Sequence, residues 1–162
     1  MKFYKTPENI VFAYESDGSQ DCLIPESQTQ ITEAEANVLR NPPMNPEQVW
    51  ERIKAERDRR KAAGVKVGAK WFHSDEASKI QQIGLVIMGA SIPAGLMWKT
   101  MDGSFVTMTP AMASQVFAAV VAHEQAVFAA AETHNTAMRA AADPAAYDFS
   151  SGWPATYAEA TP

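Results

Sequence analysis

The stretch "LMWKTMDGSFVTMTP", residues 96–110, carries the strongest structural signals in the sequence. Asp102-Gly103 stands between two arms rich in strand-forming residues, which is the pattern of a β-hairpin closed by a two-residue type I′ turn. Thr109-Pro110 then combines a capping side chain with a proline at the first helical position. The sequence therefore predicts a hairpin that leads directly into a helix.

That helix is predicted to run from Pro110 to about Ala142. Its apolar and histidine residues recur at intervals of three and four, at Val116, Val120, His123, Val127, Ala131, His134 and Met138. Such a stripe is expected to be buried against another element. We interpret Val116, Val120 and Val127 either as core residues, packed on the preceding helix, or as a self-association seam with a second copy.

The residues before the hairpin show the same order of elements. "VKVGAKWF", residues 65–72, predicts two short strands around a type II′ turn at Gly68-Ala69. Ser74 is expected to cap the next helix, which carries five large apolar side chains, Ile80, Ile83, Val86, Ile87 and Met88. Residues 64–142 are therefore predicted to form an α+β interaction domain with the order hairpin, helix, hairpin, long helix.

A separate small antiparallel β unit is predicted over residues 1–41. Two runs of strand formers separated by a turn open the chain, and "CLIP" (22–25) is a candidate third strand. Thr32 and Glu35 form a capping box ahead of a short helix. The prolines of "NPPMNP" (41–46) then disfavour helical backbone, and we expect the domain boundary there.

Residues 45–63 are predicted to form a charged linker helix. Six basic side chains lie on it, Arg52, Lys54, Arg57, Arg59, Arg60 and Lys61. Acidic residues are interleaved with them, as in the Glu56–Arg60 pair four residues apart, which favours a solvated helix. A protein-binding surface and a phosphate-binding arm are the alternatives. The net charge of −5 and the interleaved acids mean that nucleic acid is not expected as a partner.

No residue pattern points to an enzyme. "FHSD" (72–75) contains serine, histidine and aspartate, but triads are assembled in space and adjacency in sequence is no sign of one. His123 and His134 are eleven residues apart, about 16 Å along a helix, too far for one metal ion. With a single cysteine, Cys22, and no long apolar run, we expect no metal, no cofactor and no membrane segment.

Two groups of aromatic and methionine side chains are candidates for binding a partner. The first belongs to the second hairpin, and it comprises Met97, Trp98, Met101 and Phe105. Methionine adapts to varied shapes, although gap filling in the core is the alternative role. The second belongs to an aromatic C-terminal arm over residues 143–162, where Trp153 and Tyr157 are the candidates. We expect this arm either to dock as an extended segment or to fray.

Four segments of the chain together resemble small accessory proteins of tailed bacteriophages, known as tail-fibre assembly proteins or chaperones. They are "AYESDGSQD" (13–21), "RIKAERDRRKAAGVKVGAKWFHSDEASKIQQIG" (52–84), "LMWKTMDGSFVTMTP" (96–110) and "DPAAYDF" (143–149). The part from about residue 50 to 149 is similar to an uncharacterised phage and prophage domain found in such proteins. The shared features are structural signatures, with no catalytic residues among them.

The resemblance implies a partner, namely a trimeric tail-fibre protein whose distal, C-terminal region needs help to fold. The expected function is that of an assembly chaperone acting in the host bacterial cytoplasm. The alternative is a structural virion component, a fibre-tip or baseplate adaptor that stays on the virion tail. A nucleic-acid-binding regulator that uses residues 52–61 is a third and weaker alternative.

Overall fold

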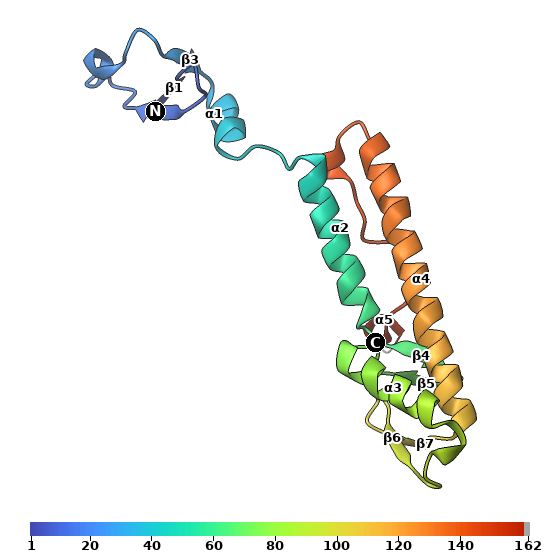
Figure 1. Ribbon diagram of the computed structural model, residues 1–162. Helices are drawn as coiled ribbons and strands as arrows, with labels where there is room; N and C mark the ends of the chain where they lie inside the picture. Colours follow the sequence, from blue (N-terminus) through green and yellow to red (C-terminus); the bar gives the residue numbers. More distant parts are fainter. Residues whose placement is uncertain (161–162) are drawn as a thin grey trace. The chain divides into compact units, whose positions relative to one another are not determined.

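The computed structural model describes residues 1–160, and it divides the chain into two compact units, Met1–Asn45 and the residues from Pro46 onward (Figure 1). The division falls within the proline-rich segment 41–46. Both units combine helices with short antiparallel strands, so the predicted α+β class is confirmed.

The first unit is a three-stranded antiparallel sheet with one helix. Its strands are β1 (Lys2–Lys5), β2 (Val11–Tyr14) and β3 (Thr29–Ile31), in the order β2-β1-β3, and its helix is α1 (Glu33–Arg40). The predicted capping box is present, since Thr32 Oγ1 accepts from Glu35 N and the Glu35 carboxylate accepts from Thr32 N. The helix contacts the sheet chiefly through β1.

The prediction of a third strand at residues 22–25 was wrong. Asp21–Leu23 form a turn of 3-10 helix (η1), and the strand comes later, at Thr29–Ile31. "CLIP" has the apolar residues of a strand, but the hydrogen bonds from Leu23 N to Gln20 O and from Ile24 N to Asp21 O keep it in a turn. The real strand is mostly polar, so its sequence carries little strand signal.

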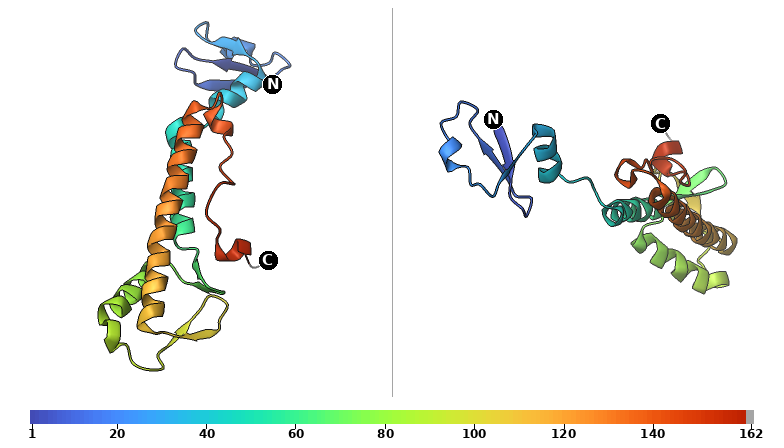
Figure 2. Two further views of the ribbon diagram at one scale, coloured as in Figure 1. Left: turned by 90° about the vertical axis from the view of Figure 1, so that its right-hand side faces the viewer. Right: turned by 90° about the horizontal axis from the view of Figure 1, so that it is seen from above.

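The second unit combines helices with two antiparallel hairpins, β4–β5 and β6–β7 (Figures 1 and 2). In chain order its elements are α2 (Pro46–Lys61), β4 (Val65–Val67), β5 (Lys70–Phe72), α3 (Glu76–Met88), η2 (Gly89–Ser91), β6 (Met97–Lys99), β7 (Phe105–Thr107), α4 (Pro110–Ala140), η3 (Pro144–Ala146) and α5 (Tyr157–Ala160). Helices α2 and α4 lie side by side, and α3 packs near the start of α4.

The apolar stripe of α4 forms the core of this unit. Val116, Val120 and Val127 are at most 2% exposed. Val116 and Val120 belong to a buried hydrophobic cluster with Val65, Phe72, Leu85, Ile92, Met108 and Ala113. Of the two roles predicted for the stripe, the core role is the one observed. These three side chains are covered within the chain, so self-association through the long helix would have to use its other residues.

Helix α3 packs on α4 as predicted, but through an unexpected face. Gln82 and Leu85 are its buried residues, and Gln82 Nε2 donates to His73 O at 2.8 Å. Ile80, Ile83 and Ile87, three of the five large apolar side chains noted in the sequence, are exposed. The reason lies in the helical periodicity, since residues 82 and 85 share one face and residues 80, 83 and 87 share the opposite one.

The prediction that Ser74 caps α3 is corrected by hydrogen bonds. Asp75, not Ser74, caps α3, since its carboxylate accepts from Ser78 N at 3.0 Å. Ser74 is buried and joins two loop ends instead, accepting from Gly64 N and donating to Lys61 O.

The turn between β6 and β7 is longer than the predicted two-residue type I′ turn. The strands pair as far as Lys99 and Phe105, and Asp102 does not adopt the positive φ that type I′ requires. Its carboxylate instead accepts hydrogen bonds from Thr100 Oγ1, Ser104 N and Lys70 Nζ, which holds a five-residue loop. The type II′ turn at Gly68, with φ of +61°, is as predicted.

Helix α2 is not the solvated spacer that its charge suggested. Val49, Ile53 and Arg60 are buried, and the helix packs along α4 as part of the second unit. The predicted interaction domain therefore begins with α2.

We predict that Gly64→Ala lowers the free energy of unfolding by about 2 kcal/mol. Gly64 has φ of +96°, and an added Cβ would collide with the Met101 thioether. Gly68→Ala is the matched control, because Gly68 has φ of +61° and open space around it, and it should cost about 1 kcal/mol. Urea unfolding of both variants measures the difference, and equal losses would contradict the close contact with Met101.

Candidate partner-binding surfaces

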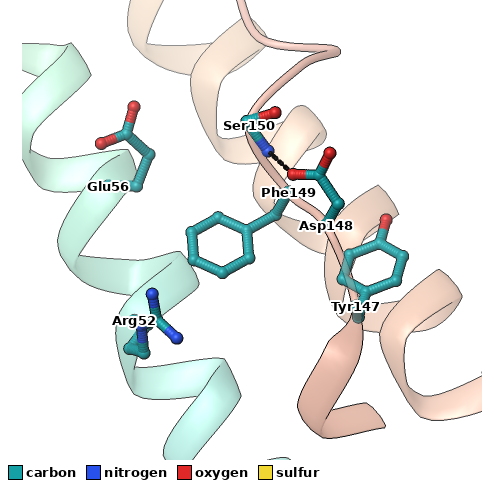
Figure 3. A pocket seen from close by; sticks show the side chains of 6 residues that line it. All are labelled: Arg52, Glu56, Tyr147, Asp148, Phe149 and Ser150. Atoms are coloured by element: carbon teal, nitrogen blue, oxygen red, sulfur yellow. Dashed lines mark hydrogen bonds between the residues drawn. The ribbon is translucent and has the colours of Figure 1, made fainter. Parts of the chain in front are cut away.

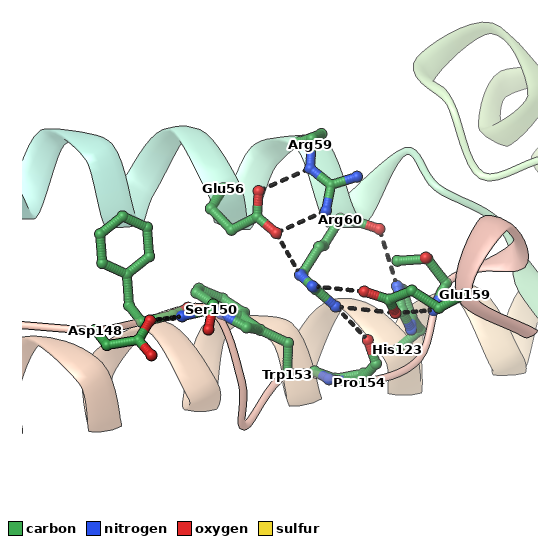
Figure 4. A network of polar contacts seen from close by, with 11 residues as sticks. Glu56, Arg59, Arg60, His123, Asp148, Ser150, Trp153, Pro154 and Glu159 are labelled. Carbon is green, nitrogen blue, oxygen red and sulfur yellow. Dashed lines mark hydrogen bonds and ion pairs between the residues drawn. The ribbon is translucent and has the colours of Figure 1, made fainter.

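The C-terminal arm docks on its own chain, and Arg60 at the end of α2 holds it (Figure 4). Arg60 is only 5% exposed. Its guanidinium donates to Glu56 Oε1 at 2.6 Å, to Pro154 O at 3.0 Å and to Glu159 Oε1 at 2.7 Å. Its backbone carbonyl lies 3.1 Å from His123 Nε2 of α4. One side chain thus joins α2 to the arm, and its backbone contacts α4.

Aromatic contacts complete the docking of the arm. The Trp153 ring lies against the His134 ring, with centroids 4.9 Å apart, and its Nε1 donates to Phe149 O at 2.7 Å. The Arg60 guanidinium covers the same indole. His134 Nδ1 is within 2.9 Å of Tyr147 Oη. Of the two behaviours predicted for the arm, docking as an extended segment is the one observed over residues 143–160.

Trp153 and Tyr157, which we predicted as partner anchors, are therefore used within the chain. Tyr157 packs edge-on against Trp71 of β5, and its backbone N–H donates to Ala63 O at 3.1 Å. Both side chains are half-buried. The sequence reasoning did not anticipate Arg60 as their organiser, although its i,i+4 pairing with Glu56 was visible.

The basic residues of α2 are engaged within the unit. Arg59 and Lys54 form ion pairs with Glu56 and Glu51. Arg57 pairs with Asp58 and lies over the Phe128 ring, 4.8 Å from its centroid. Arg52 and Lys61 lie over the rings of Phe149 and Phe128. These contacts partly neutralise the positive charge that a phosphate backbone would require.

A shallow cavity of about 390 Å³ lies between α2 and the first part of the arm (Figure 3). Arg52 and Glu56 face it from α2, and residues 147–150 close the other side. The Asp148 carboxylate is turned back to accept from Ser150 N at 2.8 Å. Its charges are already paired or stacked within the chain, so the cavity has no group set apart for a ligand.

The candidate residues of the second hairpin divide into two pairs. Met97 and Phe105 are exposed, at 51% and 59%. Trp98 packs against the core, and Met101 lies against Gly64 while its backbone N–H donates to Trp71 O. Only Met97 and Phe105 are therefore presented to a partner.

The most exposed apolar surface of the second unit is on α3, and sequence reasoning missed it. Ile80 and Ile87 are 70% and 80% exposed, and Ile83 and Met88 are exposed beside them. We call these four residues the α3 ridge. Lys79 holds the helix in this orientation by pairing with Glu124 of α4 at 2.7 Å. Apolar residues occur on more than one face of α3, so packing one face on α4 leaves another exposed. The sequence already contained this distribution of apolar residues.

The ridge is electrically neutral as well as apolar. Residues 80–98 contain no Asp, Glu, Lys, Arg or His. An apolar area of this kind on a folded unit commonly marks a protein-binding site. Within residues 1–160, no group of three or more His, Cys, Asp or Glu side chains is placed to hold a metal ion. Over the same residues, none of the helices has the length and apolar character needed to cross a membrane.

Comparison with known proteins identifies a family for the second unit. Residues 44–151, about two thirds of the chain, match the family described as "Domain of unknown function (DUF4376)". The chain belongs to this family. No curated protein and no solved structure matches it. The match includes Arg60 and the α3 ridge, and it ends before Trp153, Pro154 and Glu159.

We predict that Arg60→Met lowers the free energy of unfolding by about 3 kcal/mol and releases the arm. The loss follows because Pro154 O and Glu159 lose their buried donor. Arg59→Met is the matched control, because Arg59 is more than half exposed and its ion pair should contribute less than about 1 kcal/mol. Hydrogen exchange at the Tyr157 amide reports the release, and equal protection in both variants would contradict it.

We also predict that acid weakens the α2 end of this network. Hydrogen bonds from Arg59 and Arg60 lower the pKa of Glu56 from 4.5 to about 2. The stabilisation is therefore complete above pH 4.5, and it is lost as pH falls from 4.5 towards 2. Glu56→Gln should unfold more easily at pH 7 and lose less stability across that window. If the stability of the variant fell in parallel with that of the wild type, Glu56 would not be the titrating group.

Proposed function

We propose that this protein is an assembly chaperone for the tail fibre of a tailed bacteriophage. It would bind apolar surface in the distal, C-terminal region of the fibre protein until the trimer forms. The resemblance described above supports the choice of partner. The observation that carries the proposal is the α3 ridge, a neutral apolar surface on a well-ordered unit.

The geometry suits transient protection of apolar surface. Ile80, Ile83 and Ile87 form a row on one helix face, a pattern that packs against a helix or a sheet of a partner. Met97 and Phe105 add adaptable apolar area on the β6–β7 hairpin, at the same end of the unit as α3 (Figure 2). Because the aromatic residues of the arm are used internally, the ridge and the hairpin are the surfaces of the second unit that we propose for the fibre.

The test is co-expression of the tail-fibre protein encoded beside this chain, either with the wild-type chain or with Ile83→Glu/Ile87→Glu. We expect the wild type to keep the fibre protein soluble, and the double variant to lower the soluble yield at least about tenfold, because buried unpaired carboxylates oppose apolar contact. Ala77→Glu/Gln81→Glu is the control, since it adds the same two negative charges to α3, four residues apart and at exposed positions outside the ridge. The proposal would be overturned if the fibre protein were equally soluble with and without the wild-type chain.

Mass spectrometry of purified particles separates the chaperone from the structural component. A chaperone should be absent from mature virions. A fixed ratio to the fibre would identify a tip or adaptor that uses the same surface, and in that case the assembly role proposed here would be incomplete.

A further inference from the structure

We propose that the N-terminal unit binds an extended peptide segment of another polypeptide as an added strand alongside β3. The peptide would place alternate side chains in a groove between β3 and α1. This inference concerns residues 1–45 and does not depend on the function proposed for the second unit.

The first observation is the free edge of β3. In the sheet order β2-β1-β3, this strand pairs with β1 on one side, and no other strand of residues 1–160 pairs with it. Thr6 follows β1, and its N–H donates to Ile10 O, so the backbone groups of Thr6 point towards β2. Successive residues of an antiparallel strand direct their backbone N–H and C=O to opposite sides. Since Thr6 points towards β2, the backbone groups of Phe3 and Lys5 point towards β3. Their partners on β3 are Ile31 and Thr29, which leaves the N–H and C=O of Gln30, the residue between them, on the outer edge.

The second observation is the groove beside that edge. It has a volume of about 480 Å³ and is lined by Lys5, Thr29, Gln30, Ile31, Ala34, Glu35, Val38 and Leu39. Val38 is 57% exposed although it belongs to the apolar wall. The Thr32 capping box starts α1 directly after β3, which fixes the helix next to the strand. A strand added to β3 would therefore direct alternate side chains towards Ala34 and Val38.

The edge is short, but it lacks the other usual protections against pairing. Natural edge strands are commonly blocked by a charge, a proline or a bulge. Thr29–Ile31 contain no charge and no proline, and their register with β1 is continuous. The other edge strand, β2, is similarly open, but none of its residues lines the groove. The combination of a free edge and an apolar groove occurs at β3.

Charge indicates what kind of chain would occupy the groove. Residues 1–45 carry three basic and seven acidic groups, a net charge of −4. A second copy of the unit would bring another −4 to the interface and be repelled. The occupant that fits is a neutral or basic segment with apolar residues at every second position.

The test uses a display library of random nine-residue peptides, each linked to its own mRNA, selected against the full-length protein. We expect enriched peptides to alternate apolar and polar residues and to carry no net negative charge. Binding of a synthesised peptide should weaken at least about tenfold in Gln30→Pro, which removes the outward N–H, and in Val38→Glu.

Two matched controls isolate the groove. Ala13→Pro makes the same change on the outer edge of β2, and Asn37→Glu adds the same charge to α1 outside the groove, and both should bind within about twofold of the wild type. If Gln30→Pro unfolds the unit, as judged by circular dichroism, Val38→Glu decides the question. The proposal is overturned if no peptide is enriched or if Val38→Glu binds as the wild type does. It is also overturned if the wild type forms dimers that exclude peptide.

Discussion

The burial of one guanidinium constrains much of the second unit. Arg60 is removed from water at the end of a helix that is otherwise strongly charged, and a buried cation is tolerated only when acceptors surround it. Glu56 supplies one acceptor from the same helix, and the others, Pro154 O and Glu159, come from residues more than ninety positions later. Docking of the arm and burial of Arg60 therefore depend on each other.

This constraint decides which aromatic residues remain for a partner. Trp153 is covered by Arg60 and His134, and Tyr157 lies against Trp71, so the arm contributes to the fold of the unit. The most exposed large apolar side chains of the second unit are on α3 and on the β6–β7 hairpin. The position of Arg60 inside the family match, with Pro154 and Glu159 outside it, shows that a residue of the family domain organises the segment that follows the domain.

The two surfaces that we propose for partners differ in kind. The α3 ridge presents side chains from a helix, which suits apolar contact with a folded or folding partner. The β3 edge presents backbone groups beside a groove, which suits an extended segment. A chain that used both surfaces would bind an apolar surface of its partner at α3 and an extended segment at β3. Both are exposed in a partner that has not finished folding.

The sequence by itself determined the α+β class, the capping box at Thr32, the Gly68 turn, the long helix and its valine stripe, because periodicity, caps and turn residues act over short distances. It also carried the apolar pattern of α3, but not which face is buried. Only the tertiary structure decided that Gln82 and Leu85 face α4 while Ile80 and Ile87 face outward. It alone showed that Arg60 is buried and that Trp153 has an internal role, because these outcomes depend on contacts between residues far apart in the chain.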